Sequence, residues 1–169
     1  MTTNDEVKPT EGAPAQSYEY IFDVAVPVGA EGTPVWVNCP DITGLNPQFQ
    51  SQLQDITTYA HKGQQSQSKV GSTFTLGFNV LKIRDDTGQF QAYWQMLKDA
   101  SDKNGGDNEI LFRYYDAQGA DDAYQGTAGV QRDARPESGP TGVGWDAFTL
   151  TGTGTVVPIE NPAVTSGGV

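Results

Sequence analysis

Alternation of apolar and polar residues along the chain predicts several β-strands. The alternation is clearest over residues 69–83, where Val70, Phe74, Leu76, Phe78 and Val80 would share one face. Similar segments occur at residues 18–28, 34–39, 109–115, 123–132 and 143–153. Residues typical of turns separate most of these segments. The pattern therefore predicts a mainly β protein with a mostly antiparallel sheet.

One amphipathic helix is predicted over about residues 88–102. Its apolar side chains follow the spacing i, i+3, i+4, i+7 and would form its core face: Phe90, Tyr93, Trp94 and Leu97. Asp86 or Thr87 can cap the start of the helix, and the Gly105-Gly106 pair can end it. We expect this helix to flank the sheet.

Residues 40–68 lack a sustained period and carry seven glutamines between positions 48 and 67. A segment of this length without regular structure is uncommon inside a compact domain and is usually functional. We interpret it as an extended arm, with a short strand near residues 55–59. Residues 1–17 and 158–169 are polar and are expected to be flexible, which leaves residues 18–157 as the folded domain.

The charge balance excludes several classes of function. The chain has 10 Lys and Arg against 21 Asp and Glu, a net charge of −11, which argues against gripping nucleic acid or an anionic membrane. Cys39 and His61 are the single cysteine and histidine, so we expect no internal disulfide, metal site or cofactor. No apolar run approaches the ~20 residues of a membrane span, and no secretory signal is evident. We expect synthesis in a cytoplasm.

Three short motifs suggest chemistry, but turn formation explains each of them more simply. Asp86-Thr87-Gly88 matches the aspartic protease triplet, yet a charged Arg84-Asp85 pair precedes it and a helix follows. The acidic residues around Gly105-Gly106 would place Leu111 where a calcium loop needs a carboxylate, so at most a weak cation site remains. A third acidic cluster at residues 116–122 is typical of a solvated turn. We therefore expect no enzyme activity.

Between Val35 and Val156 a set of segments stands in a distinctive order. A short strand PVWVNCPDITGLNP is followed by the polar DITTYAHKGQQSQSKVG, the alternating STFTLGFNV and the helical GQFQAYWQMLKDAS. Three strands close the order: ILFRYYD, YQGTAGVQR and WDAFTLTGTG. This order resembles the major tail tube protein of long-tailed, siphovirus-type bacteriophages.

The resemblance implies a β-sandwich or half-barrel with one flanking helix. In that family, subunits assemble as stacked hexameric rings into a tube, and strands from every subunit close a β-barrel around its lumen. It implies a structural virion protein that conducts DNA without binding it specifically. The partners it implies are other copies of the chain and the tape measure, tail terminator and distal tail proteins.

The resemblance also directs attention to particular residues. The arm at residues 40–68 would join subunits, and its candidate contacts are Phe49, Ile56, Tyr59 and His61. Acids on predicted strands, taken as unpaired, are the candidates to face the lumen: Asp23, Glu109 and Asp146. Three alternatives stay open: a tube of a contractile or type VI secretion-like machine, a monomeric β-sandwich binding module that uses exposed Trp36 or Trp145, and a hydrolase centred on Asp86.

Overall fold

The computed structural model describes residues 10–137 and 139–165. Within them, antiparallel strands form one sheet in the order β2-β1-β5-β6-β7-β4-β3, and β8 pairs with β6 beside this path. The strands are β1 (Tyr20–Ala25), β2 (Val37–Asn38), β3 (Ile42–Asp55), β4 (Gln67–Leu81), β5 (Glu109–Asp116), β6 (Ala123–Arg132), β7 (Trp145–Gly152) and β8 (Val157–Pro158). The helices are α1 (Ala92–Ser101) and α2 (Pro162–Thr165), with 3-10 turns η1 (Ser17–Glu19), η2 (Tyr59–His61) and η3 (Gly105–Asn108).

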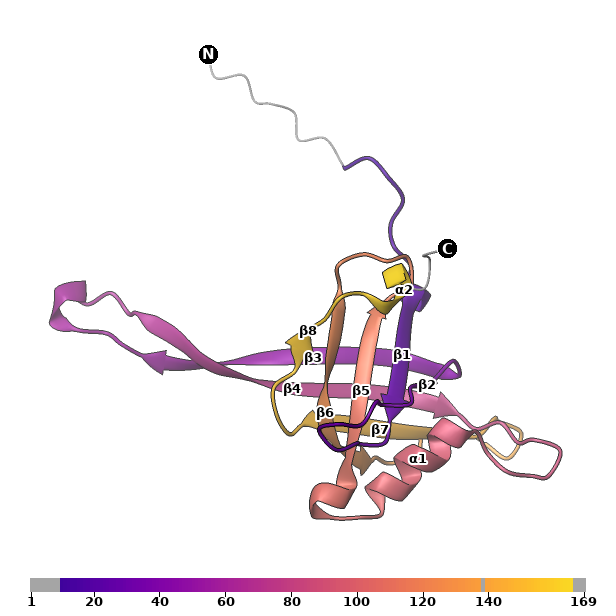
Figure 1. Ribbon diagram of the computed structural model, residues 1–169. Coiled ribbons are helices and arrows are strands. Elements are labelled where there is room, and N and C mark those ends of the chain that lie inside the picture. The colour runs from indigo at the N-terminus through magenta and orange to yellow at the C-terminus, as the bar shows by residue number, and fades with distance from the viewer. Residues whose placement is uncertain (1–9, 138, 166–169) are drawn as a thin grey trace.

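The sheet folds over on itself, so that β3, β4 and β7 run across β1, β5 and β6 (Figure 1). Aromatic side chains fill the space between the two halves. The ring of Phe74 on β4 stacks on Phe112 of β5 at 5.2 Å between centroids, and Phe78 of β4 meets Phe22 of β1 at 5.0 Å. Because β6 and β7 separate β4 from β5 in the sheet order, these contacts require the fold-over. The mainly β prediction is confirmed, and the sheet of the single chain is open, not a closed barrel.

Helix α1 is shorter than predicted. Tyr93, Trp94 and Leu97 are buried against the core, whereas Phe90 precedes the helix, forms a β-bridge with Arg84 and is partly buried. The predicted capping role of Asp86 or Thr87 is wrong. The carboxylate of Asp85 instead accepts the backbone N–H groups of residues 87 and 89, which fixes a turn before the chain reaches the helix.

The largest difference from the sequence prediction lies at residues 40–68. This segment is not an extended arm without regular structure: β3 pairs with β4 along its whole length to form a long hairpin. The strand expected at residues 55–59 is wrong, because β3 ends at Asp55 and the chain enters the η2 turn at Tyr59. The alternation that marks a half-buried strand is missing because almost every side chain of β3 is exposed on both faces. Pairing with the patterned β4 supplies the order that the sequence of β3 does not reveal.

The ends of the folded body also differ from the predicted boundaries. Residues 158–165 are not a free tail, since the buried Asn161 side chain donates to the carbonyls of Asp116 and Ala120. The first strand covers residues 20–25, not 18–28, and the second covers residues 37–38, not 34–39. The ends of the predicted flexible segments, residues 1–9 and 166–169, lie outside the described residues.

Candidate assembly interface

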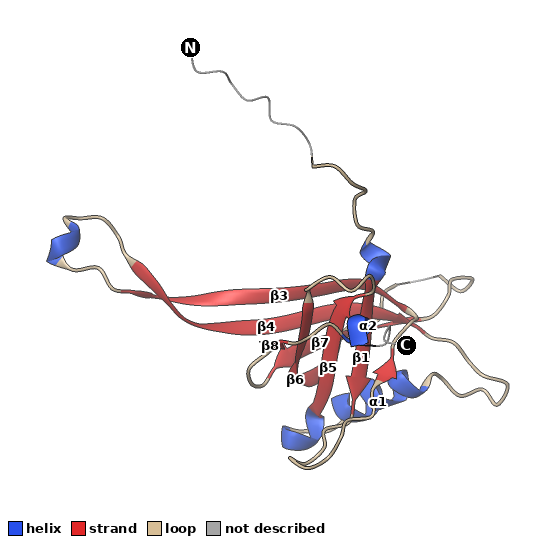
Figure 2. Ribbon diagram, turned by 45° about the horizontal axis from the view of Figure 1, so that its top comes forward, coloured by secondary structure: helices blue, strands red, loops and turns tan. Residues whose placement is uncertain are grey.

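Beyond the Phe49–Phe74 pair, the β3–β4 hairpin continues as a ribbon of two strands, which we call the distal hairpin (residues 50–73). Pairing of β4 with β7 begins only at Thr75, so within the described part of the chain no third strand supports this ribbon. Both views show it projecting from the body (Figures 1 and 2). A two-stranded hairpin is marginally stable alone in water, and this one leaves its apolar side chains uncovered. The distal hairpin is therefore a candidate surface for self-association.

The base of the hairpin is anchored by aromatic packing within the subunit. Phe49, which is 44% exposed, lies 4.8 Å from the ring of Phe74 and 5.1 Å from that of Tyr124. Tyr124 in turn stacks on Tyr114 of β5 at 5.5 Å. Phe49 thus holds the hairpin to its own body, and its predicted contact with another subunit remains a prediction.

Local hydrogen bonds give the tip of the hairpin a defined shape. The Nδ1 atom of His61 accepts the backbone N–H of Thr58 at 2.9 Å, which closes the η2 turn. At the end of β3, the carboxylate of Asp55 accepts the backbone N–H of Thr57 at 2.8 Å, and hydrogen bonding from Thr57 lowers the pKa of Asp55. The tip is thereby ordered before any partner binds.

Apolar side chains of the distal hairpin face solvent. Tyr59 is fully exposed at the tip and Ile56 is about half exposed beside it. The register shifts between Gln52 and Leu53, and this bulge leaves Val70 between the paired residues of β4. Leu53 and Val70 are both exposed. Of the predicted contact residues, Ile56 and Tyr59 are uncovered, while His61 is partly buried by its role in the turn.

Two of the three acids expected to face the lumen are neither unpaired nor exposed. Asp146 is 2% exposed; it accepts a hydrogen bond from Trp94 Nε1 at 2.8 Å and an ion pair from Arg132 at 2.9 Å. Arg135 and Lys82 lie 3.2 Å and 3.7 Å away. Burial raises the pKa of Asp146, but the hydrogen bond and the three cations outweigh it and hold the pKa below its usual value.

Asp23 is paired in a similar way, and Glu109 is not buried. The carboxylate of Asp23 is 2.8 Å from Arg113 Nε and 3.0 Å from the Asn38 side-chain amide. The sequence could not show these pairs because Arg113 and Asp23 meet only when β1 pairs with β5. Glu109 is partly exposed at the start of β5, so it alone stays a candidate lumen residue.

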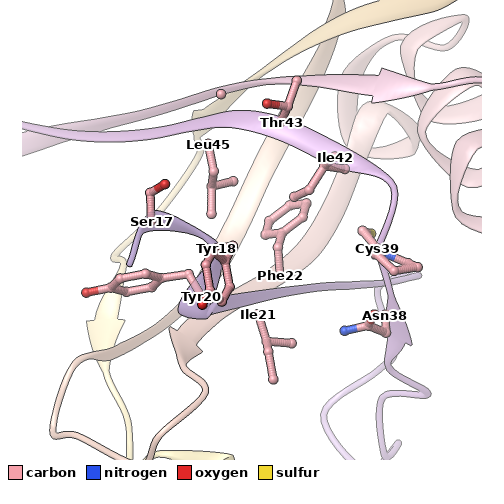
Figure 3. A pocket seen from close by; sticks show the side chains of 12 residues that line it. Ser17, Tyr18, Tyr20, Ile21, Phe22, Asn38, Cys39, Ile42, Thr43 and Leu45 are labelled. Atoms are coloured by element: carbon pink, nitrogen blue, oxygen red, sulfur yellow. The ribbon is translucent and has the colours of Figure 1, made fainter. Parts of the chain in front are cut away.

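A groove of about 500 Å³ lies between the start of β1 and the start of β3. Figure 3 shows Tyr18, Phe22, Ile42 and Leu45 around it. The hydroxyl of Tyr20 at its edge donates to the carboxylate of Asp122. This hydrogen bond, together with burial, raises the pKa of Tyr20 to about 12. Sequence patterning did not reveal the groove because its residues come from separate segments.

The remaining sequence motifs serve local structure. Asp116 accepts the backbone N–H groups of Gln118 and Ala120, which closes the acidic turn at residues 116–122. No cluster of three or more His, Cys, Asp or Glu side chains within the described residues is arranged to hold a metal. Trp36 and Trp145 are partly buried, and the Arg113 guanidinium covers Trp36 at 4.6 Å from the ring centroid. Neither tryptophan offers the open platform that the binding-module alternative needs.

Solved tail structures share this fold. The chain matches the SPP1 tail tube with a TM-score of 0.60 at 14% identity, over 91% of this chain and 84% of that one. It matches the tail of an empty GTA particle with C6 symmetry with a TM-score of 0.58 at 9% identity, over 86% of this chain and 99% of that one. It matches a six-fold symmetrised anti-feeding prophage baseplate with a TM-score of 0.50 at 7% identity, over 89% of this chain and 99% of that one. These likenesses show that the chain has a tail tube fold, as the sequence resemblance implied.

The sequence alone gives no such match. No protein-family model matches the chain, and no curated protein matches it. Within the described residues, no helix is long and apolar enough to cross a membrane.

Proposed function

We propose that this chain is the subunit of a phage tail tube, which assembles as stacked rings of six into a hollow conduit for DNA. The observation that carries the proposal is the match to the SPP1 tail tube over nine-tenths of the chain. The C6 symmetry of the GTA tail supports six subunits in a ring. The role is structural, with no bond-making step. The location follows as the virion tail, after synthesis in the bacterial cytoplasm.

The open sheet supports closure by neighbouring subunits. β3 forms one edge of the sheet over 14 residues, and among the described residues no strand lies beside its outer backbone N–H and C=O groups. A long exposed edge invites pairing with another chain, and a barrel removes such edges. β3 carries one charged residue, Asp55, so identical acidic subunits can approach along this edge with little repulsion. Strands from all six copies would then line the lumen.

The net charge of −11 suits a conduit for DNA. Six copies would carry about −66, and DNA carries one negative charge per ~1.7 Å, so an acidic wall repels the duplex and lets it slide. Glu109 is the remaining candidate for the lumen wall. The ends of the tube would meet tape measure, terminator and distal tail proteins.

Electron microscopy of the concentrated protein tests the proposal. We expect hollow rods of uniform width from the intact chain. The matched control replaces residues 51–72 with Asn-Gly, which joins the paired Gln50 and Thr73 through a tight turn and leaves β4 paired with β7. This variant should stay folded and form no rods. An intact chain that remains monomeric at all concentrations and ionic strengths would contradict the proposal.

A related function is a tube in a contractile machine, which the likeness to the anti-feeding prophage baseplate favours. Rods that recruit a sheath protein would identify this variant of the function. Rods that stay bare in the presence of such a protein would favour the long, non-contractile tail.

A further inference from the structure

The tip of the distal hairpin presents apolar side chains that the described residues of its own subunit leave exposed. Its exposed Ile56 and Tyr59 flank a turn that hydrogen bonds already hold in place. The groove beside β1 takes Ile42 and Leu45 from the start of β3, whereas the tip follows the end of β3 at Asp55. Asp55 lies ten residue steps along β3 from Leu45, about 33 Å at ~3.3 Å per residue. The tip therefore cannot reach the groove of its own chain, and both views show the two far apart (Figures 1 and 2).

The groove matches the tip in size and polarity. Its volume of about 500 Å³ falls within the range of sites that enclose small organic groups, so it has room for a tyrosine side chain and a neighbouring aliphatic one. Ile42 and Leu45 reach toward it from β3, and Tyr18 and Phe22 lie on the opposite side (Figure 3). Tyr18 is 80% exposed, although it lines an apolar groove. An aromatic side chain left open in this way is typical of an interface.

The charges of the two surfaces are complementary. The distal hairpin carries Lys62 and Lys69 against the single acid Asp55, and its tip, residues 56–62, contains no Asp or Glu. The segments that line the groove, residues 17–22 and 38–45, contain the acids Glu19 and Asp41 and no Lys or Arg. Among the described residues, Glu19 and Asp41 form no ion pair with a Lys or Arg side chain of their own subunit. In a chain of net charge −11, such separation favours contact between the tip of one copy and the groove of another.

We infer that the hairpin tip, residues 56–62, docks into the groove of an adjacent copy of the chain. Tyr59 enters the groove between Tyr18 and Leu45, and Lys62 lies toward the acids at its rim. This contact rests on the proposed tube function and names the surface that the hairpin engages there. Docking covers the apolar side chains that a lone ribbon exposes, and each copy both gives a tip and receives one.

Disulfide trapping between two variants tests the contact. Both variants carry Cys39→Ala, so that each has one thiol; one then carries Ala60→Cys in the exposed tip and the other Tyr18→Cys at the groove. The two are mixed, assembled, oxidised mildly and digested, and linked peptides are counted by mass spectrometry. The matched control pairs Ala60→Cys with Asn104→Cys, which is also exposed but precedes β5, at the opposite end of that strand from the Tyr20–Asp116 pair.

We expect the 60–18 link to exceed the 60–104 link at least tenfold in assembled protein and to vanish in dilute monomer. Rods that form without this excess overturn the docking site and leave the tube function standing. Failure of the parent chain to form rods overturns both. Lys62→Glu provides a second readout, since it should weaken assembly and Lys62→Arg should not. Equal assembly by both Lys62 variants contradicts the charge pairing on which the contact depends.

Discussion

Replacing Asp146 with asparagine removes the negative charge at the centre of a buried network while keeping nearly the same shape. The carboxylate touches Trp94, Arg132, Arg135 and Lys82, and it is 2% exposed. Breaking a buried pair by removing one partner costs about 3–5 kcal/mol. Arg135 is mostly exposed and Arg132 partly so, which lets water screen part of the loss. We therefore expect Asp146→Asn to lower the free energy of unfolding by about 2–3 kcal/mol at pH 7.

The pH dependence gives this prediction a second, independent signature. The folded protein holds the pKa of Asp146 below its usual value, so the charge contributes stability above the unfolded pKa and loses it as pH falls through the folded pKa. The difference in the free energy of unfolding between the parent and Asp146→Asn should thus be full at pH 7 and shrink below about pH 4. Urea titration followed by tryptophan fluorescence measures the free energy of unfolding of the parent and of the variant at each pH.

A surface control separates the buried network from loss of charge in general. Asp102→Asn removes an equal charge from the exposed Lys98–Asp102 pair and should leave the midpoint of urea unfolding unchanged. If Asp146→Asn is as stable as the parent at pH 7, or if its deficit persists undiminished at pH 3, the network does not stabilise the fold as reasoned.

Three further outcomes follow from the structure. Phe74→Ala should lower the free energy of unfolding by about 3–5 kcal/mol, because the ring fills the space between the two halves of the sheet, and unchanged denaturant midpoints would refute that packing. Stability should fall between about pH 10 and 12, since Tyr20 has its pKa raised to about 12 by Asp122 and its protonated form is favoured in the fold. Tyr20→Phe should make this fall less steep in thermal melts, while burial of Tyr93 and Tyr114, which raises their pKa values too, maintains the rest of it; an equally steep fall in the variant would show that Tyr20 does not contribute. Replacement of residues 51–72 by Asn-Gly should leave a cooperative melt in calorimetry, whereas loss of cooperativity would show that the distal hairpin belongs to the core.

The sequence predicted the strands whose two faces differ. β4, in its second half, and β7 alternate between buried and partly buried residues, and the helix stripe of Tyr93, Trp94 and Leu97 reaches the core. Periodicity failed for β3 because both of its faces lie in solvent, so its side chains carry no alternation. Only its register with β4 identifies it as a strand.

The candidate site was less accessible to sequence reasoning. Ile56 and Tyr59 could be selected as apolar residues in a polar segment, and both are exposed. The acids could not be assigned in this way. Asp146 and Arg132 are 14 residues apart and become partners when β6 pairs with β7, so an acid that looks unpaired along the chain lies in an ion pair in the fold.

Cryo-electron microscopy of the concentrated protein addresses the self-association of this chain most directly. The predicted result is a hollow rod of six-membered rings in which the outer edge of β3 pairs with a strand of the neighbouring copy. A particle that stays a single subunit, or an assembly that leaves this edge in solvent, would contradict it.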